Sequence, residues 1–157
     1  MVSAEWLKKT ELFEALEESQ LNAILSHASV QSFPEGKIIF QEGEKATHLY
    51  VLIQGAIDLT AGTQDKIGFM TSHVQKEGGV FGVPALIDPC RYNVTAKSLR
   101  PSTALRIEAE HLKKWMEEDS KAGMAIMKKL ALIYFNRLNE LRKGAVSFFK
   151  VFPQKTP

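Results

Sequence analysis

The sequence has a single cysteine, Cys90, among its 157 residues. One thiol excludes an internal disulfide and any site that needs several cysteines of one chain, although it could still be redox-sensitive. No apolar stretch reaches the roughly 20 residues that a membrane-spanning helix needs, and no basic segment followed by an apolar run begins the chain. We therefore expect a cytoplasmic protein with no membrane partner.

The charges are nearly balanced, with 20 Lys and Arg residues against 18 Asp and Glu residues. This balance gives no broad electrostatic field for nucleic acid or for an anionic membrane. The chain after Lys143 is also too short for a helix-turn-helix, so we expect no direct nucleic acid binding. The length fits one domain with a sizeable core, and we treat residues 1–157 as that domain.

Motifs of the common enzyme classes are absent from the sequence. It has no Walker loop, no dinucleotide-binding fingerprint and no Ser-His-Asp order. A cupin-type metal enzyme needs two histidines that alternate on one strand, whereas the four histidines here are scattered. They are His27, His48, His73 and His111. We expect a protein that is not an enzyme and carries no cofactor; a cupin-like metal-dependent enzyme, or haem binding through His73 or Cys90, is an alternative.

Apolar residues follow helical spacing in residues 1–28, with an interruption near Glu17 to Gln20. This pattern predicts a bundle of two short N-terminal helices, with Ser19 as the N-cap of the second.

Helical spacing returns in residues 109–144, which predicts a short hinge helix and then a long helix from Ser120. We expect Gly144 to end the long helix and residues 145–157 to form an apolar tail. One stripe of the long helix is spaced as in a coiled coil, and we expect it to form a homodimer interface, the alternative being a wide core-facing stripe on a monomer. The stripe consists of Met127, Ala131, Tyr134, Leu138 and Leu141.

Between the helices, residues 29–108 change to short β-branched and aromatic runs separated by turn residues. The run His48–Ile53 is apolar on both faces, and Gln54-Gly55 predicts a tight hairpin into a strand at Ala56–Thr60. Regular short strands of this kind favour a jelly-roll barrel, so we expect a mainly β fold with flanking helices. The other expected strands are 30–33, 37–40, 67–74, 80–81, 92–98 and 103–107.

The stretch from Gly78 to Ala96 has the pattern of a strand, a glycine turn, one short helical turn and a returning strand. Glycines let backbone N–H groups approach an anion, and the amides that open a short helix carry partial positive charge. Such a stretch can hold a phosphate group.

Residues 7 to 143 resemble the cyclic nucleotide-binding domain family. The resemblance is carried by Phe33–Glu44 and His48–Gly55, by Leu105-Arg106-Ile107, and by glycines at the turns of the family's barrel. These glycines are Gly36, Gly43, Gly55 and Gly82. The resemblance implies a β-roll (a double-stranded β-helix) between an N-terminal helical bundle and a hinge helix, and a long dimerisation-type helix that moves when ligand binds.

The family's phosphate-binding cassette reads roughly Phe-Gly-Glu-Leu-Ala-Leu and, several residues later, Arg-x-Ala-Thr. The resemblance implies that the glutamate binds the ribose 2′-hydroxyl and that the arginine pairs with the cyclic phosphate. Here Val83 stands at the glutamate position and Pro84 follows it; alignment on Thr95 puts Tyr92 at the arginine position and Arg91 one residue earlier. Val83 accepts no hydrogen bond and one residue along a strand changes the face, so we expect weak or no cyclic nucleotide binding.

We therefore expect a stand-alone regulatory sensor module that binds a small molecule, with a nucleotide as one option, and signals through the long helix. The alternative is a true cAMP- or cGMP-binding domain in which a shifted register turns Arg91 inward. Because Val83 and Tyr92 make the pocket more apolar, a flat ligand with little charge would fit it better than a cyclic phosphate. The expected ligand-binding residues are Phe81, Gly82, Val83, Pro84, Ala85, Arg91, Tyr92 and Asn93.

Overall fold

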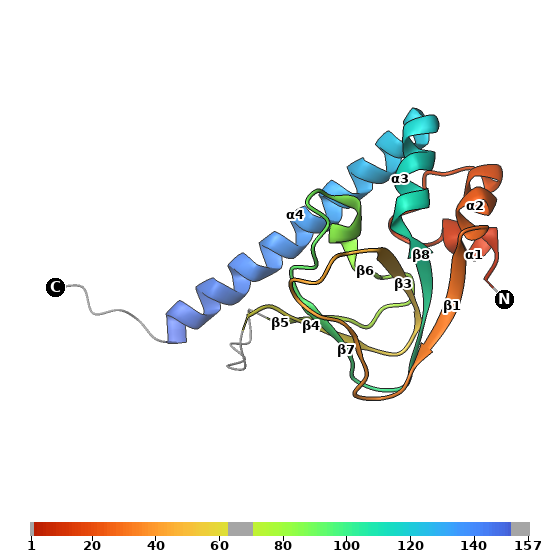
Figure 1. The fold of residues 1–157 in the computed structure, drawn as a ribbon. Coiled ribbons are helices and arrows are strands. Elements are labelled where there is room, and N and C mark those ends of the chain that lie inside the picture. Colours follow the sequence, from red (N-terminus) through yellow and green to blue (C-terminus); the bar gives the residue numbers. More distant parts are fainter. Residues whose placement is uncertain (1, 63–70, 152–157) are drawn as a thin grey trace.

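The computed structural model describes residues 2–62 and 71–151 of the chain. Their strands form two four-stranded antiparallel sheets, and helices lie at one end of the sheets and along one side (Figure 1). The strands are β1 (Ala28–Phe33), β2 (Ile38–Phe40), β3 (His48–Gln54), β4 (Ile57–Thr60), β5 (Thr71–Val74), β6 (Val80–Phe81), β7 (Thr95–Ser98) and β8 (Ser102–Glu108). This arrangement confirms the expected mainly β fold with flanking helices. Residues 67–70 of the expected strand 67–74 lie outside the described residues.

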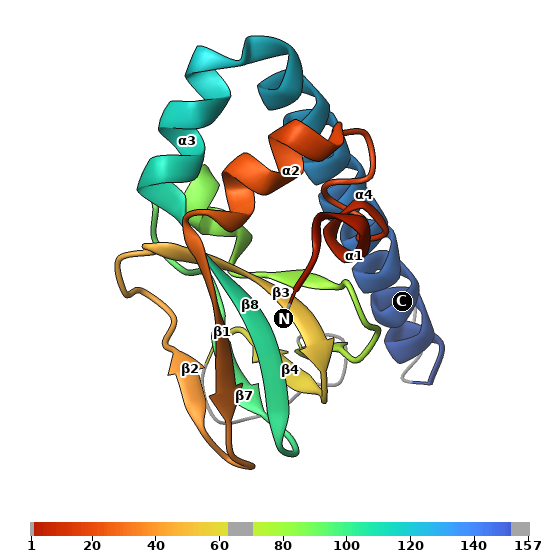
Figure 2. The same cartoon turned by 90° about the vertical axis from the view of Figure 1, so that its right-hand side faces the viewer.

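The strand order is β1-β8-β3-β6 in the first sheet and β2-β7-β4-β5 in the second. The helices are α1 (Ala4–Lys8), α2 (Glu18–Leu25), α3 (Ala109–Glu118) and α4 (Ser120–Val151), with one 3-10 turn, η2 (Val83–Leu86), after β6. Figure 2 shows α2 and α3 above the first sheet. Among the described helices, none is both long and apolar enough to cross a membrane.

The turn at Gln54-Gly55 is not the expected hairpin. β3 belongs to the first sheet and β4 to the second, so the chain crosses between the sheets at this point. Gly55 has a φ of +115°, and a Cβ atom there would lie 2.1 Å from the Ser102 Oγ. A glycine between two apolar strands marks a tight turn in the sequence, but it serves equally at a corner where a strand changes sheet.

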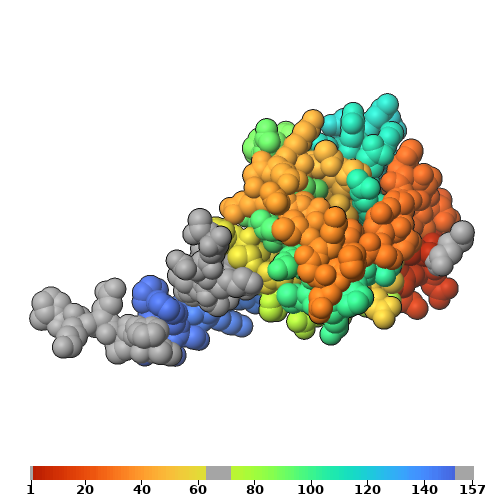
Figure 3. Space-filling model, turned by 60° about the horizontal axis from the view of Figure 1, so that its bottom comes forward, coloured from red at the N-terminus to blue at the C-terminus, as the bar shows by residue number. Residues whose placement is uncertain are grey.

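The sequence pattern predicts that the long helix ends at Gly144, but the helix continues past this residue. α4 runs for 32 residues to Val151, so residues 145–151 of the expected tail are helical, and residues 152–157 lie outside the described part. Glycine in a helix interior costs about 1 kcal/mol relative to alanine, which neighbouring helix formers can offset. Figure 3 shows the C-terminal part of α4 projecting from the main body.

The N-terminal helices are shorter than the apolar spacing suggests, because α1 ends at Lys8 and turns carry the buried side chains that follow. Ser19 is not the N-cap of α2. Glu17 takes that position, and its backbone N–H donates to the Gln20 Oε1 at 2.8 Å, as in a capping box.

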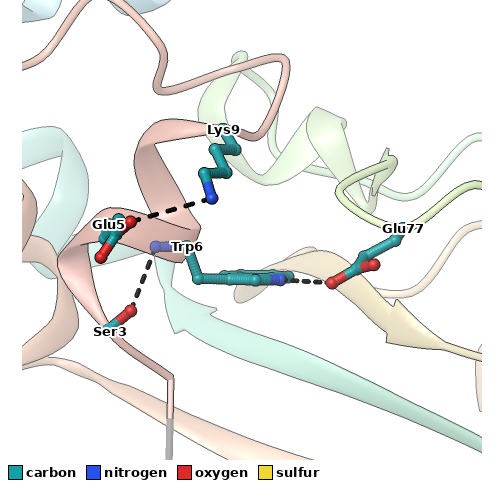
Figure 4. Close-up of polar contacts among 5 residues, drawn as sticks. All are labelled: Ser3, Glu5, Trp6, Lys9 and Glu77. Atoms are coloured by element: carbon teal, nitrogen blue, oxygen red, sulfur yellow. Dashed lines mark hydrogen bonds and ion pairs between the residues drawn. The ribbon is translucent and has the colours of Figure 1, made fainter.

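Trp6 ties α1 to the loop that leads into β6. Its indole N–H donates to the Glu77 carboxylate at 2.6 Å, while its backbone N–H is capped by the Ser3 Oγ at 3.1 Å (Figure 4). Figure 4 also shows Lys9 reaching back to Glu5 one helical turn earlier. The hydrogen bond between Trp6 and Glu77 holds the N-terminal segment beside β6, the strand that leads into the Gly82 turn.

Candidate functional site

The turn after β6 keeps the glycine that the resemblance requires. Gly82 has a φ of +76°, and a Cβ atom there would lie 3.0 Å from the His48 carbonyl oxygen, so only glycine fits without strain. Val83 is 1% exposed and opens η2 together with Pro84, which has no N–H to donate. The Ala85 amide donates to the Gly82 carbonyl at 3.2 Å and is therefore already engaged.

Tyr92 fills the interior of the roll. Its side chain is 5% exposed, and its ring stacks on Phe40 with the centroids 3.8 Å apart and the planes 13° from parallel. Its hydroxyl donates to the His48 carbonyl at 2.7 Å and accepts the His48 backbone N–H at 3.2 Å. Burial raises the pKa of Tyr92 to about 12, against a smaller opposing effect of the hydrogen bond to His48, so the phenol stays neutral at physiological pH.

Further rings extend this cluster across both sheets. Phe81 stacks on Tyr50 with centroids 5.0 Å apart and lies 6.3 Å from Phe40. Phe33 meets Tyr50 edge to face at 6.3 Å. Aromatic side chains of the protein itself therefore occupy the space that faces the Gly82 turn.

Arg91 and Tyr92 point in opposite directions. The Arg91 guanidinium is exposed and donates to the Gly43 carbonyl at 3.2 Å, and its backbone forms an isolated bridge with Lys45. Of the other expected ligand-binding residues, Asn93 is exposed and Pro84 is half-buried. The remaining ones are buried, namely Phe81, Gly82, Val83 and Ala85.

Arg106 belongs to the stretch that carries the family resemblance, but the sequence did not predict it as a binding residue. It lies on β8 directly opposite Tyr50 of β3, so the two side chains project from the same face of the sheet. Its Nη2 lies 3.4 Å from the His48 Nδ1, and its Nε is buried without a hydrogen-bond partner among the described residues. Burial, and then the charge of Arg106, lower the pKa of His48, whereas Glu108 acts in the opposite direction.

The N-terminal segment and α4 both contact β6. The Arg137 guanidinium of α4 donates to the Val80 carbonyl, and the Glu11 carboxylate accepts the Val80 N–H at 3.3 Å. An ion pair between Lys129 of α4 and Glu14, which lies in the turns between α1 and α2, joins α4 to the N-terminal segment. A movement of the Gly82 turn would therefore act on α4 through the contact between Val80 and Arg137.

The expected dimer stripe lies on the outer side of α4. Met127, Leu138 and Leu141 are 39%, 45% and 44% exposed, and Ala131 is exposed as well. Tyr134 is partly buried, and this burial raises its pKa. The interface itself stays a prediction.

The histidines have partners of ordinary kinds. His73 lies 3.1 Å from the buried Asp58, and His111 lies 3.5 Å from Glu108 and stacks on His27 at 4.3 Å. Within residues 2–62 and 71–151, no three His, Cys, Asp or Glu side chains are grouped so that they could hold a metal ion.

Comparison with known proteins places this geometry in context. The family model described as the cyclic nucleotide-binding domain matches residues 30–119. A solved structure from Geobacter metallireducens GS-15, assigned as a cyclic nucleotide-binding protein, is 30% identical; the match covers 88% of this chain and 99% of that one, with a TM-score of 0.77. The sensor domain of the transcriptional regulator DNR from Pseudomonas aeruginosa shares the fold at 22% identity, with 82% and 91% of the two chains covered and a TM-score of 0.66.

A curated relative is the CRP-like cAMP-activated global transcriptional regulator of Mycobacterium tuberculosis. It is 23% identical over 128 residues, which make up 81% of this chain. The chain spans about half of that regulator's length, the matched part being 56%.

Proposed function

The chain belongs to the cyclic nucleotide-binding domain family, and from this membership we propose that it is a regulatory sensor module with weak or no affinity for cyclic nucleotides. The observation that carries the proposal is Tyr92, which stands at the position of the family's phosphate-pairing arginine. Its ring is buried inside the roll and hydrogen-bonded to the His48 backbone.

The loss of affinity for cyclic nucleotides follows from two missing contacts, one to the phosphate and one to the ribose. A hydrogen bond to a charged group contributes about 1.5–3 kcal/mol, so loss of the arginine fork and of the ribose acceptor at Val83 weakens a cyclic nucleotide by orders of magnitude. A ligand in that position would also have to displace a buried aromatic ring, which costs about 1.5–3 kcal/mol more. The other reading, with Arg91 turned inward, requires Tyr92 to give up its buried position, because its ring stacks on Phe40 and its hydroxyl is hydrogen-bonded to the His48 backbone.

The module would signal through α4. Arg137 of α4 donates to the Val80 carbonyl, one residue before Phe81 and two before Gly82. A ligand that shifts the glycine turn would change this contact and bias the position of the long helix.

Calorimetry with cAMP and cGMP tests the proposal directly. We expect the natural chain and an Arg91→Gln variant to give no saturable heat below about 1 mM ligand, the affinity that corresponds to only about 4 kcal/mol. Micromolar binding that disappears in Arg91→Gln would show that Arg91 holds the phosphate and would overturn the proposal. Thermal unfolding of both proteins in parallel checks that they are folded.

We also propose that the outer stripe of α4 forms a homodimer. The expected result is a mass near twice the 17.6 kDa of one chain by light scattering, and a mass near one chain for Leu138→Glu, because a buried carboxylate at a helix seam is unfavourable. Asn136→Glu places the same charge on another face of α4 and should remain dimeric. A Leu138→Glu protein with an unchanged mass would rule out this seam.

A further inference from the structure

We propose that Arg106 binds a small oxyanion, a phosphate or carboxylate group, inside the roll. The arginine that the family places on the strand after the glycine turn is Tyr92 here, and the positive charge enters from β8 instead. The inference rests on the proposed sensor function only in locating the ligand in the same roll.

The register of the first sheet directs Arg106 inward. It is paired with Tyr50, whose ring stacks on Phe81 in the interior, and directly opposite residues of a ladder share a face. The charge of Arg106 acts on the hydroxyls of Tyr50 and Tyr92 and on the ring of His48. The guanidinium therefore lies among the polar tips of the aromatic cluster.

No anion of the described residues neutralises this guanidinium. No Asp or Glu side chain in residues 2–62 and 71–151 forms an ion pair with Arg106 within 4.0 Å. The nearest acid along the strand, Glu108, lies 3.5 Å from His111 instead. Arg91 and Arg137, by contrast, each donate to a backbone carbonyl. Arg106 itself is partly buried, and its Nε is buried without a partner among the described residues, so a bound anion would compensate the lost solvation of this donor.

The donors around Arg106 match an oxyanion. A guanidinium with its Nε unused can present the Nε and one Nη as a parallel fork to two oxygens. The His48 Nδ1 faces two donors, the Arg106 Nη2 at 3.4 Å and the Thr47 hydroxyl at 2.8 Å, so it accepts and the neutral ring carries its proton on Nε2. His48 thus adds an N–H donor to the same end of the roll.

The size of the ligand follows from the packing. Tyr92 and Phe40 stack with their ring centroids 3.8 Å apart and fill the roll interior, which leaves little room there for a ligand as large as a nucleotide. Arg106 and His48 are both partly exposed, so a small ion reaches them from the end where β3 begins. The site therefore favours a small phosphate or carboxylate compound over a whole cyclic nucleotide.

The test uses inorganic phosphate, acetate and cAMP as probes on the full chain at constant ionic strength, with chloride as the reference anion. Thermal unfolding and the NMR signal of the Arg106 Nε–H report binding. We expect phosphate or acetate to stabilise the natural chain in a saturable way and to shift the Nε–H signal. The apparent affinity should fall at least tenfold in Arg106→Met and by less in Arg106→Lys. Arg142→Met, the same change on the exposed part of α4, is the matched control.

Stability without any anion provides a second readout. Arg106→Met should be as stable as the natural chain or more so in chloride, because the unpaired charge is gone while the apolar stem is kept. Added phosphate should reverse that order. Equal responses to phosphate and acetate in the natural chain and Arg106→Met, or no response to either in the natural chain, would overturn the inference.

The titrations with cAMP and with phosphate test the proposed function and this inference separately. Tight cAMP binding that survives in Arg106→Met would refute the proposed weak affinity and this site together, whereas phosphate binding lost only in Arg106→Met supports the site whatever cAMP does. Loss of phosphate binding in Arg91→Gln, with binding retained in Arg106→Met, would show that Arg91 binds the anion. That result would refute this inference and leave the proposed function standing.

Discussion

A Val83→Glu/Tyr92→Arg double variant is expected to bind cAMP at least a hundredfold more tightly than the natural chain. The two changes restore the ribose acceptor and the phosphate fork that the family resemblance implies. Each charge-assisted contact is worth about 1.5–3 kcal/mol, and together they correspond to roughly 10²- to 10⁴-fold in affinity. Removal of the Tyr92 ring also opens the space beside Phe40 that the stacked pair now fills.

Calorimetry on the double variant should be accompanied by its unfolding curve. The new arginine would lie near Arg106, so the ligand-free variant should be less stable than the natural chain and should regain stability with cAMP. Tyr92→Phe is the matched control, since it keeps the ring and loses only the hydrogen bonds to His48. If the double variant binds no better than Tyr92→Phe, the cassette residues are not what limits affinity.

Gly55→Ala should destabilise the fold by about 3 kcal/mol or more, a large part of the 5–15 kcal/mol typical of a domain. The added Cβ would lie 2.1 Å from the Ser102 Oγ and 2.6 Å from the Ser102 Cα, so backbone as well as side chain must move. Ser102 also accepts the Ala56 N–H at 3.1 Å, and a shift would break this buried bond. Its φ of +115° adds backbone strain for any residue with a Cβ.

Gly36→Ala isolates the backbone contribution, because Gly36 has a φ of +81° and nothing lies within 4 Å of the added atom. It should cost only about 1 kcal/mol. Urea unfolding of the two variants beside the natural chain measures both effects. A Gly55→Ala loss equal to that of Gly36→Ala would mean that the corner between the sheets is looser than its contacts imply.

Strand positions could be read from the sequence because alternation and turn residues are local signals. The runs around His48–Ile53 and Thr103–Ile107 became β3 and β8 with small changes at the ends. The sequence also predicted that Tyr92 stands at the family's arginine position, because this sequence and the family's motif align on Thr95. In the structure, Tyr92 is buried and Arg91 is exposed, although β7 begins only at Thr95 and not at Tyr92 as expected.

The features that could not be predicted from the sequence depend on contacts between residues that are distant in the chain. Nothing local distinguishes a hairpin at Gly55 from a corner, because the difference is whether β4 pairs with β3 or with β7. The inward direction of Arg106 likewise follows only from its register against Tyr50. The available signal was the alternation of β8, which puts Arg106 on the face of the buried Ala104.

The position of β8 in the first sheet governs how the chain can fold. β8 lies between β1 and β3, and its partners on β1, from Ala28 with Ile107 to Phe33 with Ser102, are roughly 70 to 80 residues away in sequence. Such distant pairings are slow to form, on a timescale of about milliseconds to seconds for β-rich domains. A chain growing from its N-terminus keeps the facing edges of β1 and β3 unpaired until β8 has been made, and during that interval it is most exposed to aggregation.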